Sequence, residues 1–394
     1  MKRLLVLLAL LVLLIPGAKA ASSDAAPGSD ASDSGVSAPQ SISDIVEKQM
    51  QGSGANDLYS KAPQQAQNSL GKLGLKSPDP NGFSKLTPKG LFSLVLSNLS
   101  DAAKAPMRSM ALVLGVLLAY ALLNTLKTSL AEKPLKGVFD TVCSLCIAGS
   151  VIVPVAACIR TCDNTITQAG NFSISFLPVF AGLSAASGHP TSAAVLQAIM
   201  LMLSNGIIAL ASTTFVPLVS IYLAFCVIGS VAPGIKISGV ASFAKNVAVW
   251  GMGLSVTIFV AVLAIQGMIA NAADTVAVKA AKFVVGSFVP VVGSALSDAL
   301  NTIVGCANLL KTATGAYAIV VFIVIFLPPV LECLLWMLAM DVSAAAAEIL
   351  SVDSMKGLLK SVREALGVIL ALVISTELAL IVSVSVMLLL GMGS

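Results

Sequence analysis

The stretch from Lys282 to Gly315 reads KFVVGSFVPVVGSALSDALNTIVGCANLLKTATG. It is apolar enough for membrane depth, yet too polar for a helix that faces lipid on all sides. If residues 291–312 form a helix, small and polar side chains recur every four residues on one face. We expect that helix to stop at Lys311–Gly315, because a basic last turn followed by glycine is a common helix end. This polar stripe and its flanking positions comprise Gly293, Ser297, Asp298, Asn301, Gly305 and Asn308.

Three interpretations of the polar stripe follow from the behaviour of small residues in membranes. Small residues let two helices approach closely, and they also line water-filled cavities. The stripe therefore predicts a packing helix inside a bundle, a helix that lines a pore or cavity, or a helix that lies on the membrane surface.

The composition places the chain among integral membrane proteins. Of its 394 residues, 57% are hydrophobic and 11% are charged, whereas soluble domains have about 25% charged residues. The net charge of +4 is dispersed along the chain, which argues against binding to nucleic acid. The apolar residues form long runs rather than amphipathic stripes. We predict an all-α polytopic transmembrane bundle with about six to eight crossings.

The N-terminal part shows targeting and linker features. Lys2 and Arg3 precede a short apolar run that ends at an Ala-Lys-Ala cleavage pattern, so residues 1–20 are predicted to be a signal peptide. Residues 21–82 are predicted to be an extracytoplasmic segment, largely disordered with short helices. Thr87 and Pro88 suit the start of an amphipathic lead-in helix over residues 83–105. Residues 106–394 then form the membrane domain.

The apolar runs and the basic residues predict a topology. Lys127, Lys133 and Lys136 flank the first loop, which suits the cytoplasmic side of the membrane. The run over residues 192–231 fits either two spans or a re-entrant piece followed by one span. The expected spans cover residues 107–127, 138–159, 192–231, 246–270, 315–338 and 365–390.

Two short motifs recur at nearly the same offset. FLPV at 176–179 recurs 112 residues later as FVPV at 288–291, and FVP at 215–217 recurs 111 residues later as FLP at 326–328. We predict two repeats of the same sense, over about 138–236 and 246–340, because duplicated halves with interrupted helices are a common transporter plan. A chance match is the alternative, since such motifs are short. The prolines expected to interrupt helices are Pro178, Pro217, Pro290 and Pro328.

Two acidic residues fall within predicted spans. Glu377 lies near the middle of the last apolar run, where a charge costs about 2.5–3.5 kcal/mol. Glu332 lies closer to the end of its span. Glu377 is expected either to make a protonated or hydrogen-bonded interhelical contact or to belong to an ion or substrate pathway. We expect Glu377→Gln to preserve insertion, and normal activity in that variant would exclude the pathway role.

Local motifs give no indication of an enzyme, a cofactor or a metal. Cys143-x-x-Cys146 and Cys158-x-x-x-Cys162 resemble metal-ligand spacing, but they lack histidine or acidic company within apolar helices. We interpret these cysteines as small packing residues. His189 is the single histidine, which excludes histidine-rich metal sites and leaves no basis for triad chemistry.

The organising stretch also resembles a known family. The run from Phe288 to Gly315, with PVVG, SDALNTIVGC and LLKTATG, is similar to stage III sporulation protein AE of endospore-forming bacteria. The resemblance carries over no catalytic or ligand-binding residues. It implies a multi-pass protein of the mother-cell-derived outer forespore membrane, with its N-terminal segment in the intermembrane space.

The resemblance also implies a role and partners. The expected role is the conduit subunit of a channel or secretion-like complex that supports the engulfed forespore. The implied partners are a secretion-type ATPase, ring-forming membrane proteins and a forespore protein across the intermembrane space. A non-conducting membrane scaffold of the complex and a stand-alone solute permease are the alternatives.

Overall fold

The computed structural model describes residues 42–80, 82–85, 87–127, 133–231, 238–288 and 293–389, and these residues contain helices and no strand. The predicted signal peptide and the adjoining linker up to residue 41 lie outside the described residues, as does Pro290. The all-α polytopic fold is therefore confirmed over the part of the chain that the structure describes.

Short helices form the described N-terminal part. They are α2 (Ile42–Ser53), η1 (Ala55–Asp57), α3 (Leu58–Lys61), α4 (Gln64–Lys72) and η2 (Gly82–Lys85). Leu58, Leu70 and Leu75 are almost fully buried and anchor this segment. Helices α2 and α4 pack against α10, and the Gln49 amide donates a hydrogen bond of 3.3 Å to the Ile303 carbonyl.

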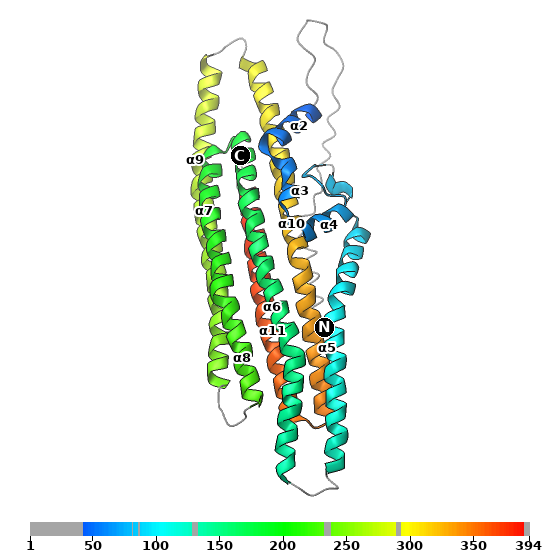
Figure 1. The fold of residues 1–394 in the computed structure, drawn as a ribbon. Helices are drawn as coiled ribbons and strands as arrows, with labels where there is room; N and C mark the ends of the chain where they lie inside the picture. Colours follow the sequence, from blue (N-terminus) through cyan, green and yellow to red (C-terminus); the bar gives the residue numbers. More distant parts are fainter. Residues whose placement is uncertain are drawn as a thin grey trace. The chain divides into compact units, whose positions relative to one another are not determined.

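Long helices form the remainder (Figure 1). Six segments are long and apolar enough to cross a membrane, and the run from Pro190 to Gly229 counts as one of them. A crossing needs about 20 residues, so α6, α9 and α10, with 54, 51 and 57 residues, are each more than twice that length. The elements are α5 (Pro88–Lys127), α6 (Lys133–Ala186), α7 (Pro190–Leu210), the π-helical turn η3 (Ala211–Phe215), α8 (Val216–Val231), α9 (Ser238–Phe288), α10 (Gly293–Ile349) and α11 (Asp353–Leu389).

Successive long helices run in alternating directions (Figure 1). Helices α5, α8 and α10 end where α6, α9 and α11 begin, so these termini share one end of the bundle. The run from Pro190 to Gly229 is one apolar segment long enough to cross a membrane, whereas the sequence predicted two spans, or a re-entrant piece followed by one span, over residues 192–231. Helix α10 packs on α11, α5 and α6, while α9 packs on α7, α8 and α11.

The core lies around α10. Phe172, Phe176 and Phe180 follow one another along one face of α6, and Phe172 meets Phe322 edge to face with ring centroids 5.4 Å apart. The most apolar part of α10 is 56% buried and that of α11 is 67% buried, whereas that of α9 is 22% buried. Helices α10 and α11 are therefore central, and α9 is peripheral.

The turns that follow α4, α6 and α10 share one backbone conformation. Gly74, Gly188 and Ser351 have φ angles of 75°, 91° and 57°. In each case the next residue donates its N–H to a carbonyl five positions earlier, as Val352 does to Ala347 at 2.9 Å. This pattern closes a helix C-terminus and favours glycine at the left-handed position. Ser351 is the non-glycine member of the three.

Three local expectations were wrong. The helix that contains the organising stretch does not stop at Gly315, because α10 continues to Ile349. Pro178 and Pro328 do not interrupt their helices, since α6 and α10 run through them. The lead-in helix and the first span form one helix, α5, which begins at Pro88 as expected and passes through Pro106. A proline removes one helical hydrogen bond, and packing of neighbouring helices can hold the helix together despite that loss.

Pro217 lies next to an irregular turn of its helix. The π-helical turn η3 directly precedes it, and the Val216 N–H donates to the Ala211 carbonyl five residues back. Such turns absorb an extra residue within a helix. The proposed repeats correspond to two hairpins of the same direction, α6 with α7–α8 and α9 with α10 (Figure 1). Whether the two hairpins superpose stays a prediction.

Candidate functional site

The polar stripe lies at the start of α10, and the structure describes two of its side-chain environments. Gly293, Ser297, Asp298 and Asn301 belong to or adjoin the described helix, but their side-chain surroundings lie outside the described residues. Gly305 is exposed, and a Cβ at this position would have no heavy atom within 4 Å. Asn308 is half-buried. At Gly305, therefore, the stripe makes no close packing contact within the described chain.

Other glycines make the close helix contacts. A Cβ on Gly170 would lie 2.6 Å from Ile208, one on Gly251 would lie 2.8 Å from Phe215, and one on Gly315 would lie 2.5 Å from Leu388. These positions join α6 to α7, α9 to η3 and α10 to α11. These glycines therefore have the packing role that small residues can take in membranes.

Glu377 is enclosed between helices. Its residue is 2% exposed, and no side chain among the described residues bonds or pairs with it. Gly315 contacts Leu388, and Gly367 contacts Met337. The antiparallel register of α10 and α11 thus places Glu377 level with residues 326–327, next to the Pro328–Pro329 pair.

The two prolines give this level of α10 spare hydrogen-bond acceptors. Pro328 and Pro329 have no amide hydrogen, so the carbonyls of Val324 and Ile325 lose their intrahelical donors. A neutral carboxyl group carries one O–H donor. The position therefore suits a neutral Glu377, which corresponds to the interhelical-contact interpretation.

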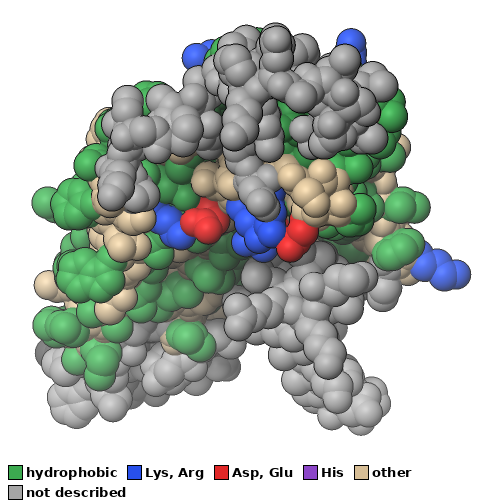
Figure 2. All heavy atoms as spheres, turned by 90° about the horizontal axis from the view of Figure 1, so that it is seen from below, with side chains coloured by type: hydrophobic (Ala, Val, Ile, Leu, Met, Phe, Trp, Pro, Cys, Tyr) green, Lys and Arg blue, Asp and Glu red, His purple; other side chains and the backbone are tan. Residues whose placement is uncertain are grey.

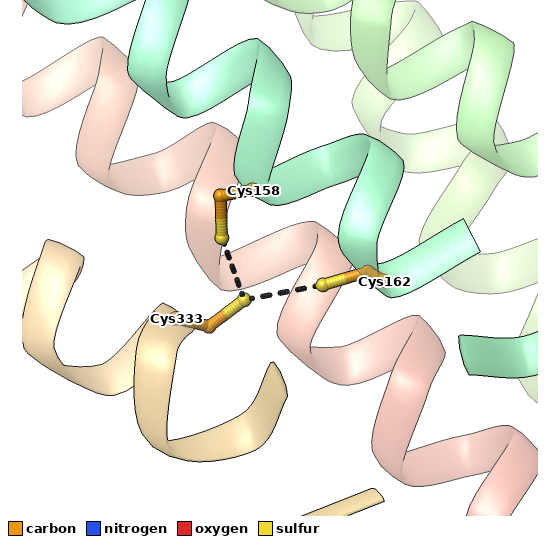
Figure 3. A group of neighbouring side chains, drawn as sticks. All are labelled: Cys158, Cys162 and Cys333. Carbon is orange, nitrogen blue, oxygen red and sulfur yellow. Dashed lines mark hydrogen bonds between the residues drawn. The ribbon is translucent and has the colours of Figure 1, made fainter. Parts of the chain in front are cut away.

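Glu332 lies beside a cysteine cluster that the sequence did not indicate. It is half-buried and directly precedes Cys333, which is buried between α10 and α6. Cys158 and Cys162 come from successive turns of α6, and each sulfur lies 3.5 Å from the Cys333 sulfur (Figure 3). Cys143 and Cys146 are not part of this cluster.

A buried carboxylate from α9 caps α7. The Asp274 carboxylate accepts hydrogen bonds from the backbone N–H groups of Thr191 and Ser192 at 2.9 and 2.7 Å. Its residue is 0% exposed, and the His189 Nδ1 atom lies 4.0 Å away. A helix N-terminus has unsatisfied N–H groups and a partial positive charge, so an acidic group is favourable there.

Lys311 joins this arrangement from α10. Its residue is 3% exposed, its Nζ atom lies 5.9 Å from the centre of the Phe180 ring, and it interacts electrostatically with Asp274. The sequence assigned Lys311 to the last turn of a helix, but the structure places it inside α10 against the α6–α7 connection. Asp274 and Lys311 therefore fix the packing where α6, α7, α9 and α10 meet.

A groove adjoins one exposed face of α9, within the part of that helix that is apolar enough to cross a membrane. The described residues that line it all come from α9, so α9 supplies one of its walls. Each of these residues is exposed, including Trp250 at 74%. Asn246, Gly253 and Thr257 make one side of the groove small or polar, which is unfavourable against lipid and suits contact with protein or water. The lining residues are Asn246, Val249, Trp250, Gly253, Leu254 and Thr257.

Ion pairs gather at the end of the bundle where α10 ends and α11 begins. The pairs are Lys245–Glu364 at 2.8 Å, Arg363–Asp341 at 3.1 Å and Lys356–Glu348 at 2.7 Å. Figure 2 shows basic and acidic side chains alternating across the middle of this end. They tie α9, α10 and α11 together, and as partly exposed pairs each contributes little to stability.

Comparisons with known proteins give a consistent result. The family model described as stage III sporulation protein AE matches residues 79–391. Stage III sporulation protein AE of Bacillus subtilis (strain 168) is 28% identical over 164 residues, which cover 42% of this chain and 41% of the relative. The alignment thus spans about two fifths of the relative's length. No solved structure matches the chain.

Proposed function

Because the chain belongs to the stage III sporulation protein AE family, we propose that this sporulation protein is the membrane-embedded conduit subunit of a channel complex between mother cell and forespore. It resides in the mother-cell-derived outer forespore membrane, with its N-terminal segment in the intermembrane space. Its partners are a secretion-type ATPase, ring-forming membrane subunits and a forespore protein.

The α9 groove carries the conduit proposal. Polar side chains at membrane depth face protein or water rather than lipid, and the chain leaves Asn246 and Thr257 exposed beside a groove. The central helices α10 and α11 are packed against each other through contacts such as Gly315–Leu388. The groove on α9 therefore forms one wall of the conduit, and other subunits or further copies of this chain supply the remaining walls.

The proposal is tested first by accessibility. Asn246→Cys and Thr257→Cys are expected to react with a water-soluble thiol reagent in the assembled complex. Ile258→Cys is the matched control, because Ile258 is exposed on the same helix and does not line the groove. The exposed Cys146 is replaced by serine in all three variants to lower the background. Equal protection of all three positions would contradict a water-lined groove.

A second test separates the conduit from the scaffold. A Cβ on Gly253 or on Gly149 has no heavy atom within 4 Å, so leucine at either position is expected to fold. In a deletion strain, Gly253→Leu is expected to leave the complex assembled but block late forespore reporter expression, whereas Gly149→Leu complements. Normal reporter expression with Gly253→Leu would favour the non-conducting scaffold. Transport by the protein expressed without its partners would favour the permease.

A further inference from the structure

We propose that Cys158, Cys162 and Cys333 form a binding site for a thiophilic d¹⁰ metal ion, Cu(I), that joins α6 to α10. Cys158 and Cys162 are one helical turn apart, so both thiols point from the same face of α6. Cys333 points toward them from α10, and the three sulfurs converge (Figure 3). The fold thus brings together residues separated by 171 and 175 positions in sequence.

The spacing of the sulfurs fits a central ion. The Cys333 sulfur lies 3.5 Å from each of the other two, and all three sulfurs lie within 4.8 Å of one another. The point in the plane of the three sulfurs that is equidistant from them lies at most about 2.4 Å from each, and metal–thiolate bonds measure about 2.3 Å. The three side chains are therefore positioned for coordination without movement of either helix.

The donor set selects the ion. Thiolates are soft ligands that favour Cu(I), zinc and iron–sulfur clusters over hard cations. Structural zinc is almost always four-coordinate, whereas the described residues bring three sulfurs together here. A three-sulfur site suits Cu(I), which needs no fourth ligand. Each thiol that binds as thiolate releases its proton to solvent, and the copper keeps its oxidation state.

The surroundings shield an ion bound by the three sulfurs. The three cysteines are 0% exposed, which excludes water and oxidants from the sulfurs. Glu332 lies within electrostatic range of Cys158 and Cys162, so it belongs to the immediate surroundings of the three sulfurs. An ion at this position would cross-link α6 and α10, two core helices that also pack together through Phe172 and Phe322.

The experiment measures metal binding by the full chain purified in detergent. Protein from copper-supplemented cells and apoprotein titrated anaerobically with Cu(I) against a bathocuproine competitor are both examined. We expect about one Cu(I) per chain, bound by sulfur in X-ray absorption spectra. Cys333→Ala is expected to lower the affinity at least tenfold, and Cys158→Ala/Cys162→Ala to abolish binding. Parallel titration with Zn(II) is expected to show weaker binding.

Matched controls keep the test decisive. Cys306→Ala removes another buried thiol from α10, and Cys146→Ala removes another thiol from α6; neither belongs to the cluster. Both are expected to bind Cu(I) as the parent does, and size-exclusion profiles report whether each variant is folded. Absence of Cu(I) from both preparations, binding that survives Cys333→Ala, or a clear preference for Zn(II) would overturn the proposal.

Discussion

Gly315 on α10 packs directly against the side chain of Leu388 on α11: a Cβ on Gly315 would lie 2.5 Å from Leu388 Cδ2 and 2.8 Å from its Cγ. We predict that Gly315→Ala destabilises the protein, because overpacking costs about 1–3 kcal/mol and exceeds the gain of about 1 kcal/mol from replacing glycine in a helix. Thermal unfolding in detergent measures the change.

Gly305→Ala is the matched control for this prediction. It lies on the same helix with open space around its Cβ position, so it is expected to raise stability slightly. In a Leu388→Ala background, Gly315→Ala should no longer destabilise, because the clashing side chain is gone. Equal effects of Gly315→Ala in both backgrounds would show that the contact does not limit helix packing.

The cap that Asp274 provides to α7 gives a second prediction. Asp274→Ala leaves the N–H groups of Thr191 and Ser192 without their acceptor in a buried place. We expect a loss of about 2–4 kcal/mol in the free energy of unfolding. Asp101→Ala, which breaks the exposed pair with Lys104, should change it by at most about 0.5–1 kcal/mol. Chemical denaturation of both variants makes the comparison, and equal losses would refute the capping role.

The left-handed turn at Ser351 gives a third prediction. Its φ of 57° is unfavourable for a residue with a Cβ. We expect Ser351→Gly to stabilise the protein by about 0.5–1 kcal/mol, whereas Ser100→Gly, on the exposed face of α5, should destabilise it by a similar amount. Melting temperatures distinguish the two. A fall in the melting temperature of Ser351→Gly would mean that the serine hydroxyl makes a compensating contact.

The enclosed position of Glu377 gives a fourth prediction. Glutamine keeps the shape and a hydrogen-bond donor, so Glu377→Gln is expected to insert, unfold at nearly the parental temperature and support normal forespore development. Thr376→Val, at the neighbouring buried position, controls for local repacking. If Glu377→Gln folds but blocks development while Thr376→Val does not, Glu377 belongs to a transport pathway.

Hydropathy was enough to predict the all-α bundle and most of its long apolar segments. Long apolar runs such as residues 365–390 permit little besides a membrane helix. Local stop signals were less reliable: Lys311 and Gly315 resemble a helix end, yet one packs beneath Phe180 and the other against Leu388. A glycine that lets two helices approach and a glycine that ends a helix look the same in one sequence.

The candidate sites depended on contacts between distant segments. Asp274 meets Thr191 across 83 positions, and Cys162 meets Cys333 across 171. Nothing local to Cys333 marks it as the third member of a cluster, and the isolated spacing of Cys158 and Cys162 pointed to packing. Pairing of such positions is fixed by helix register, which hydropathy does not encode.

The π-helical turn at residues 211–215 is a place where this helical segment can absorb a change in chain length. Removal of one residue there would convert the π turn into an ordinary α-helical turn and keep α8 in register with α7, whereas removal of one residue between Val216 and Ile221 would rotate the rest of α8 by about 100°. Tyr222, which is 5% exposed, would then move to the position of Ile221, which is 46% exposed. Homologues of this protein should therefore tolerate a single-residue deletion in the π turn more readily than one in α8.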